Sequence, residues 1–240
     1  MTRTPTFSLR IGALVGQAIS THFRNLLPFT LLSAIALGPW IALRLYASTA
    51  EPSQALLWTG VVLQQLGSQI LVGALTYGVV QHLRGEPANL AMTVSVGVQS
   101  FLRVIAVSIV VGLIIGVGTL LLFVPGIILM MCFYVAIPAA VLERKGIGAS
   151  MRRSLDLTRG SRWQIFGAAI LFGLIMIGTF MLLGLVMAST SDLSNPPLWA
   201  EITLNVLIAP FGSTMAGVCY YMLRMGKENV DSKQIAAVFD

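Results

Sequence analysis

The feature that most constrains this chain is a series of apolar stretches long enough to cross a lipid bilayer as helices. A membrane-spanning helix needs roughly 18 or more predominantly apolar residues. Six spans can be drawn, at residues 26–47, 55–83, 101–123, 126–142, 163–188 and 198–223. The fourth is the weakest, because it is short and contains Pro138, and it could tilt, kink or re-enter.

The composition agrees with a membrane protein. Of the 240 residues, 56% are hydrophobic and only 10% are charged, and the mean hydropathy is +0.86. A soluble globular protein carries roughly 25% charged residues, so this chain has too little polar surface to face water. We therefore predict an all-α integral membrane protein with six transmembrane helices, built as one domain over residues 1–225 with a short polar tail at 226–240.

The basic residues predict the orientation of these spans. Arg44 alone lies on one side, and the other side holds Arg3, Arg10, Arg24, Arg84, Arg103, Arg144, Lys145, Arg152, Arg153, Arg159, Arg162, Arg224, Lys227 and Lys233. Positive charge marks the cytoplasmic side, so both termini and the polar tail are expected there. The loops near Glu51, Pro125 and Asp192 are expected on the far side. The excess of arginine over lysine, 12 to 3, favours a GC-rich bacterium and hence the inner membrane.

Three segments on the expected cytoplasmic side have the pattern of interfacial amphipathic helices. The clearest is 147–159, which sets Ile147, Met151, Leu155 and Thr158 against Arg152, Asp156 and Arg159. Segments 11–23 and 89–102 show similar spacing, and each of the three precedes two spans. The pattern suggests three repeats of helix plus hairpin. The alternative is that any amphipathic helix near a membrane has this spacing.

One stretch, from Pro125 to Gly167, carries a family resemblance. Its motif residues are Pro125-Gly126, Pro138, Glu143, Ser154, Leu155, Leu157, Gly160 and Trp163. In these residues the chain resembles the bacterial membrane-protein family typified by the membrane domain found with some glycerophosphoryl diester phosphodiesterases. The resemblance implies a six-helix membrane fold without settled biochemistry. The hydrolytic activity belongs to a separate soluble barrel in that family and is not carried over.

The residue types present argue against catalysis. His22 and His82 are the only histidines, no acidic residue falls in the middle of a span, and there is no Gly-rich phosphate-binding loop. Cys132 and Cys219 lie apart in apolar stretches, which excludes a disulfide framework and a usual metal site. No basic run is interleaved with aromatic residues as in nucleic-acid binding. We therefore expect no enzyme, no cofactor, no metal and no nucleic-acid partner.

Polar and small residues inside the spans have two interpretations each. The polar set is Gln64, Gln65, Ser68, Gln69 and Asn205. It could form a substrate path between spans two and six, or it could simply make interhelical hydrogen bonds. The glycines are Gly112, Gly116, Gly173, Gly178 and Gly184. They favour close packing within the bundle, with a homodimer as the alternative.

The basic loop is the best functional candidate in the sequence. It places six cations within 19 residues: Arg144, Lys145, Arg152, Arg153, Arg159 and Arg162. Arginine can hold a lipid phosphate through two hydrogen bonds, although positive charge that only sets topology would also explain the loop. Glu143 is expected to pair with Arg152 or Arg153 and pin the helix. These features predict a non-enzymatic membrane protein that interacts with anionic lipid, organises the membrane or supports a protein partner. The alternative is a small transporter or transporter subunit.

Overall fold

The computed structural model describes residues 9–47, 53–86, 89–190 and 198–228. This part of the chain consists of helices joined by short turns and contains no strand. The elements are α1 (Ile11–Arg24), α2 (Leu26–Ala47), α3 (Gln54–Leu83), α4 (Leu90–Leu121), α5 (Phe123–Cys132), α6 (Ala136–Leu142), α7 (Ile147–Thr158), α8 (Arg162–Thr190), α9 (Leu198–Thr203), the π-helical turn η1 (Leu204–Ile208) and α10 (Pro210–Glu228). Residues 229–240, most of the predicted polar tail, lie outside the described residues.

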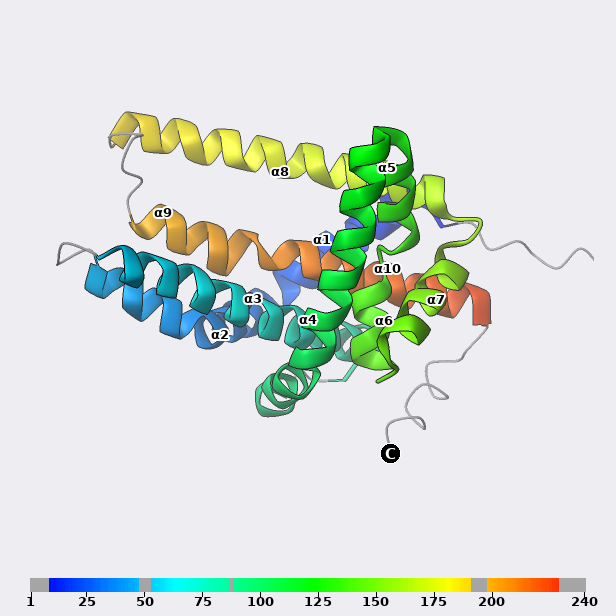
Figure 1. Cartoon of the computed structure of the whole chain (residues 1–240), viewed down its shortest axis with the longest axis horizontal. Coiled ribbons are helices and arrows are strands. Elements are labelled where there is room, and N and C mark those ends of the chain that lie inside the picture. Colours follow the sequence, from blue (N-terminus) through cyan, green and yellow to red (C-terminus); the bar gives the residue numbers. More distant parts are fainter. Residues whose placement is uncertain (1–8, 48–52, 87–88, 191–197, 229–240) are drawn as a thin grey trace, which may run out of the picture.

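Six segments of the described chain are long and apolar enough to span a membrane, as the sequence predicted. Figure 1 shows α2, α3, α8 and the α9–α10 pair running along the long axis, whereas α4 and α5 cross that direction. Three arginines lie toward one end of this long axis (Figure 1): Arg84 directly after α3, Arg162 at the start of α8 and Arg224 near the end of α10. Arg84 is close enough to Arg224 for the two charges to repel each other. We call this the basic end. Arg44, in the last turn of α2, lies at the opposite end.

Helix α3 forms the centre of the core, since α2, α4 and α10 all pack on it. Its second half is buried, including Leu75 and Val79, neither of which is exposed. Helix α4 approaches α3 closely at Gly97. A Cβ atom there would lie 2.8 Å from the backbone oxygen of Ile70 and 2.9 Å from Ala74 Cβ. Glycine therefore allows the two backbones to pack at a distance that a larger residue would prevent.

The structure corrects the prediction of a third interfacial helix. Residues 89–102 do not form a separate element, because they continue into the third span as the single helix α4. Thr93, Gly97 and Ser100 are buried along this segment. Of the three predicted interfacial segments, the first and third are separate helices, α1 and α7, and the second is the start of α4. The three-copy repeat stays a prediction.

The fourth span is broken into α5 and α6 at residues 133–135. Pro138 lies in the first turn of α6, where its missing N–H is tolerated, and its ring would clash with the carbonyl four residues earlier in a continuous helix. The break leaves the Cys132 carbonyl oxygen without its usual helical partner. Ser154 Oγ donates to that oxygen at 2.8 Å and Thr158 Oγ1 at 3.3 Å. The kink thereby becomes a docking point for α7.

The α4–α5 turn does not lie where the sequence predicted. The loop near Pro125 was expected at the end opposite the basic residues, yet Val124 and Arg162 line the same groove. Figure 1 likewise shows α5 beside the start of α8. The turn itself is apolar and exposed from Leu120 to Val124, with Leu120 88% exposed. The hairpin therefore presents a hydrophobic tip beside the basic end.

The expectation that the glycine-rich faces pack inside the bundle is wrong. A Cβ atom would meet nothing within 4 Å at any of Gly112, Gly116, Gly173, Gly178 or Gly184. Helix α8 carries three of these glycines, and none of the residues in its most apolar stretch of 18 is buried in the described chain. These faces point away from the described part of the chain.

Candidate functional site

Helix α7 is held against the basic end of the bundle by its hydroxyl-bearing face. It begins after Gly146 and ends before Gly160, whose φ of +82° is a left-handed conformation that glycine adopts freely. Ser150, Ser154 and Thr158 are fully buried, whereas Ile147 is 37% exposed. The buried face of α7 thus consists largely of small polar residues. Ser154 and Thr158 donate to the Cys132 carbonyl at the α5–α6 break, and Ser150 donates to the Lys145 and Gly146 carbonyls just before α7. Hydrophobic periodicity alone could not reveal this rotation.

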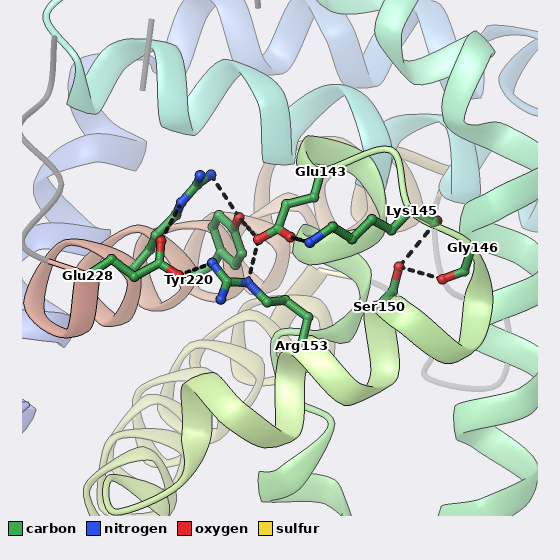
Figure 2. Close-up of polar contacts among 8 residues, drawn as sticks. Glu143, Lys145, Gly146, Ser150, Arg153, Tyr220 and Glu228 are labelled. Carbon is green, nitrogen blue, oxygen red and sulfur yellow. Dashed lines mark hydrogen bonds and ion pairs between the residues drawn. The ribbon is translucent and has the colours of Figure 1, made fainter. Parts of the chain in front are cut away.

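Glu143, at the end of α6, is the centre of the polar contacts around α7 (Figure 2). Its side chain is only 7% exposed. Its carboxylate accepts from Arg153 Nε at 2.6 Å, pairs with Lys145 Nζ at 2.7 Å and accepts from the Tyr220 hydroxyl at 2.8 Å. Burial by itself would raise the pKa of Glu143, but these three hydrogen bonds outweigh it and hold the pKa below its ordinary value. Glu143 is therefore charged near neutral pH.

The network continues onto α10. Arg153 also forms an ion pair with Glu228, and Arg224 Nε donates to the other Glu228 oxygen at 3.1 Å. Arg224 Nη1 donates to the Tyr220 hydroxyl at 3.2 Å, which closes the ring of contacts. Lys227 Nζ adds hydrogen bonds to the backbone oxygens of Asp156 and Arg159. Together these contacts tie α6, α7 and α10 into one unit.

The six candidate cations divide into two sets. Lys145 and Arg153 are used within the network. Arg144, Arg152 and Arg159 are exposed, and their side chains make no hydrogen bond or ion pair to any described residue. Arg162 is partly buried, and its Nε atom lacks a hydrogen-bond partner in the described chain. The structure thus brings four unpaired arginines to the same end of the molecule.

The predicted intramembrane polar set does not form one cluster. Gln64 Nε2 donates to Asn205 Oδ1 at 2.8 Å, which links α3 to η1. Gln69 Oε1 instead accepts from Ser108 Oγ on α4 at 3.3 Å, and Gln65 lines a groove with residues of α4. Ser68 donates to the Gln65 backbone oxygen within its own helix. Within the predicted set, the Gln64–Asn205 hydrogen bond is the contact that links spans two and six.

Three further titratable residues, His22, Cys132 and Cys219, are buried in the described part of the chain. His22 is buried between α1 and α10, with Nδ1 3.3 Å from Thr214 Oγ1 and its ring edge-on to Phe211. Burial holds the pKa of His22 below its ordinary value. Cys132 and Cys219 are free and buried. Within the described ranges, no group of three His, Cys, Asp or Glu side chains could hold a metal ion.

Several residues of the site were not predicted as site residues. They are Tyr220, Arg224, Lys227 and Glu228 on α10, together with the hydroxyl groups of Ser154 and Thr158. Arg224, Lys227, Ser154 and Thr158 stood out in the sequence only for orientation, resemblance or helix pattern. The four-residue spacing of Tyr220, Arg224 and Glu228 was the available signal, because it puts them on one helical face. That spacing alone does not identify Glu143, more than 75 residues earlier, as their partner.

Residues 61–222 match the model of a protein family described as a domain of unknown function, DUF7847. The chain belongs to this family. The matched region runs from α3 to α10 and includes Glu143, α7 and Tyr220. No curated protein matches the chain. No solved structure matches it either. The comparisons give no link to the diesterase-associated membrane domain, so that resemblance stays a prediction.

Proposed function

We propose that this chain is a non-enzymatic, multi-pass integral membrane protein that binds anionic phospholipid at its basic end. One observation carries the proposal: Lys145 and Arg153 form ion pairs with Glu143, and Arg153 also with Glu228, yet Arg144, Arg152, Arg159 and Arg162 have no partner in the described chain. A rigidly held helix with unpaired arginines is suited to bind lipid phosphates. Binding there would organise lipid around the protein or support a protein partner.

Energetics favour lipid as the ligand of these arginines. A basic residue near an anionic membrane surface contributes about 1 kcal/mol, which salt screens. Three exposed arginines would therefore add roughly 3 kcal/mol at low ionic strength. Fixed positions also matter, because α7 loses little conformational freedom on binding when its network is already formed.

The basic end is assigned to the cytoplasmic side of a bacterial inner membrane, because cytoplasmic loops carry the excess of Lys and Arg. In this arrangement α2, α3, α8 and the α9–α10 pair cross the bilayer. The apolar α4–α5 hairpin enters and returns on the basic side. Both termini are then cytoplasmic, as they would be with six crossing helices.

A small transporter remains the second candidate, supported by the Gln64–Asn205 hydrogen bond between α3 and η1. It lies at a π-helical turn, where the Ala209 amide donates to the Leu204 oxygen just before Pro210. Irregular backbone inside a membrane is tolerated where it lines a cavity or is buried in protein. Flux into proteoliposomes that is lost on Asn205→Leu would favour this candidate over the first.

Titration with anionic and zwitterionic lipid, followed by native mass spectrometry, tests the first proposal. The triple variant Arg144→Gln, Arg152→Gln, Arg159→Gln should retain several-fold less phosphatidylglycerol than the wild type, with phosphatidylcholine unchanged. Arg44→Gln, at the opposite end, serves as the control. Equal phosphatidylglycerol retention by the wild type and the triple variant would contradict lipid binding and would leave these arginines only the role of setting the orientation in the membrane.

A further inference from the structure

A groove between α5 and α8 has the composition of a binding site for a single phospholipid. Its volume is about 380 Å³, and it is lined by Val124, Ile127, Ile128 and Met131 of α5 and by Arg162, Trp163 and Phe166 of α8. We propose that this groove holds one anionic phospholipid, with its phosphate on Arg162 and an acyl chain along α5. The inference deepens the proposed function, on which it rests, by naming one specific site.

Arg162 supplies the recognition of charge. It is the only charged residue among those that line the groove. Its Nε atom is buried and has no hydrogen-bond partner in the described chain. A buried guanidinium donor without an acceptor is costly, and a phosphate supplies two acceptors in a geometry that fits the guanidinium fork. The Arg162 guanidinium is therefore suited to bind an anion in this groove.

The surrounding charge also favours an anion. Arg159 and Arg162 both lie close enough to Lys227 to repel it, and Asp156 is the acidic residue that attracts Lys227 there. The Lys227 ammonium is directed to the backbone oxygens of Asp156 and Arg159. Arg159, Arg162 and Lys227 therefore lie near one another, with Asp156 as the acidic residue beside Lys227, which leaves an excess of positive charge.

The remaining lining residues of the groove fit a lipid acyl chain rather than a small ion. The four α5 residues are all apolar, and α5 lies in the hairpin whose exposed tip suits hydrocarbon. Trp163 is 76% exposed beside Arg162, and its ring meets Phe166 edge-on with centroids 6.0 Å apart. Tryptophan at this level is typical of the boundary between headgroups and acyl chains. A free phosphate would use Arg162 but leave the apolar wall exposed.

The closeness of Trp163 to Arg162 provides a local probe. In the variant Trp40→Phe, Trp58→Phe, Trp199→Phe, Trp163 is the only tryptophan left. The full chain is placed in phosphatidylcholine vesicles that contain either brominated phosphatidylglycerol or the same fraction of brominated phosphatidylcholine. Bromine quenches tryptophan on contact, so the ratio of the two quenching constants measures selectivity at the groove. We expect a ratio of about five, the contribution of one basic residue near a lipid phosphate.

Two substitutions separate this site from general attraction. Arg162→Gln should bring the quenching ratio to about one, and Ile128→Gln, which keeps the cation but makes the wall polar, should lower it as well. Arg152→Gln is the comparison, because it removes the same charge from an exposed position on α7 and should lower the ratio less than Arg162→Gln does.

The possible results are distinct. Equal loss with Arg152→Gln and Arg162→Gln would overturn the discrete site while keeping lipid binding by the basic end. Displacement of brominated phosphatidylglycerol by millimolar inorganic phosphate would show that the groove recognises phosphate alone, which also overturns the proposal. A ratio of one in the parent variant would contradict the site, and the triple arginine variant would then decide the proposed function separately.

Discussion

Replacing Glu143 with Gln should destabilise the docking of α7 more than any other single carboxylate-to-amide change in the described chain. The Glu143 side chain is almost fully buried and accepts hydrogen bonds from two cations and a tyrosine hydroxyl. The amide keeps the shape of the carboxylate but loses its charge and one acceptor oxygen. The partly buried Arg153 guanidinium would then retain only Glu228 as its counter-ion.

The magnitude follows from the burial of the partners. A hydrogen bond to a charged group contributes about 1.5–3 kcal/mol. Lys145 is half exposed, so solvent screens most of its interaction, whereas Arg153 is only 22% exposed. We therefore expect Glu143→Gln to lower the free energy of unfolding by about 2 kcal/mol. Asp156→Asn is the comparison on α7, because Asp156 is exposed and attracts Lys227 without a side-chain hydrogen bond to the described residues, so its loss should cost less.

Thermal unfolding in detergent at several pH values measures the effect. Because the pKa of Glu143 is lowered in the folded chain, its stabilisation is present above the ordinary carboxyl pKa of 4.5 and is lost as the pH falls through the folded value. The difference between wild type and Glu143→Gln should therefore shrink on acidification. A variant as stable as Asp156→Asn at pH 7, with the same acid dependence as the wild type, would refute the role of Glu143.

Two further predictions concern packing and topology. Gly97→Val should strongly reduce the thermal stability of the purified chain, because the added side chain would separate α4 from α3. Gly112→Val should be tolerated, because a Cβ atom there meets nothing within 4 Å. Equal losses of stability in the two variants would contradict the close α3–α4 packing. Leu122→Cys should resist an impermeant maleimide applied outside intact cells, while Ser189→Cys, at the far end of α8, should react. Labelling of both would place the hairpin tip on the outer side and restore six crossing helices.

The sequence predicted the helices well where apolar length or amphipathic spacing determines them. The bounds of α2 agree with the first span, α3 starts one residue before the predicted second span, and the 147–159 segment becomes α7. These features are local, so periodicity and run length suffice. Residues 89–102 were predicted as a separate interfacial helix, whereas they form the start of α4. The prediction failed because the buried residues of this segment, such as Thr93 and Ser100, are small and polar.

The site was harder to predict because its contacts join distant parts of the chain. Pairing of Glu143 with one of two neighbouring arginines could be anticipated from the loop, and the structure selects Arg153. Tyr220 and Glu228 could not be assigned, because nothing in the local pattern shows that the end of α10 reaches α7. The position of the α4–α5 turn likewise depends on tertiary packing against α8, which charge counts and hydropathy do not encode.

The most direct test of lipid binding by the basic end is the lipid that leaves the membrane with the protein. The full chain is extracted in mild detergent, purified at low and at high salt, and its bound phospholipids are quantified against those of the starting membrane. Our account predicts that anionic lipid is enriched severalfold at low salt, and that high salt or the triple arginine variant removes most of this enrichment. Bound lipid with the same composition as the membrane at both salt concentrations would contradict it.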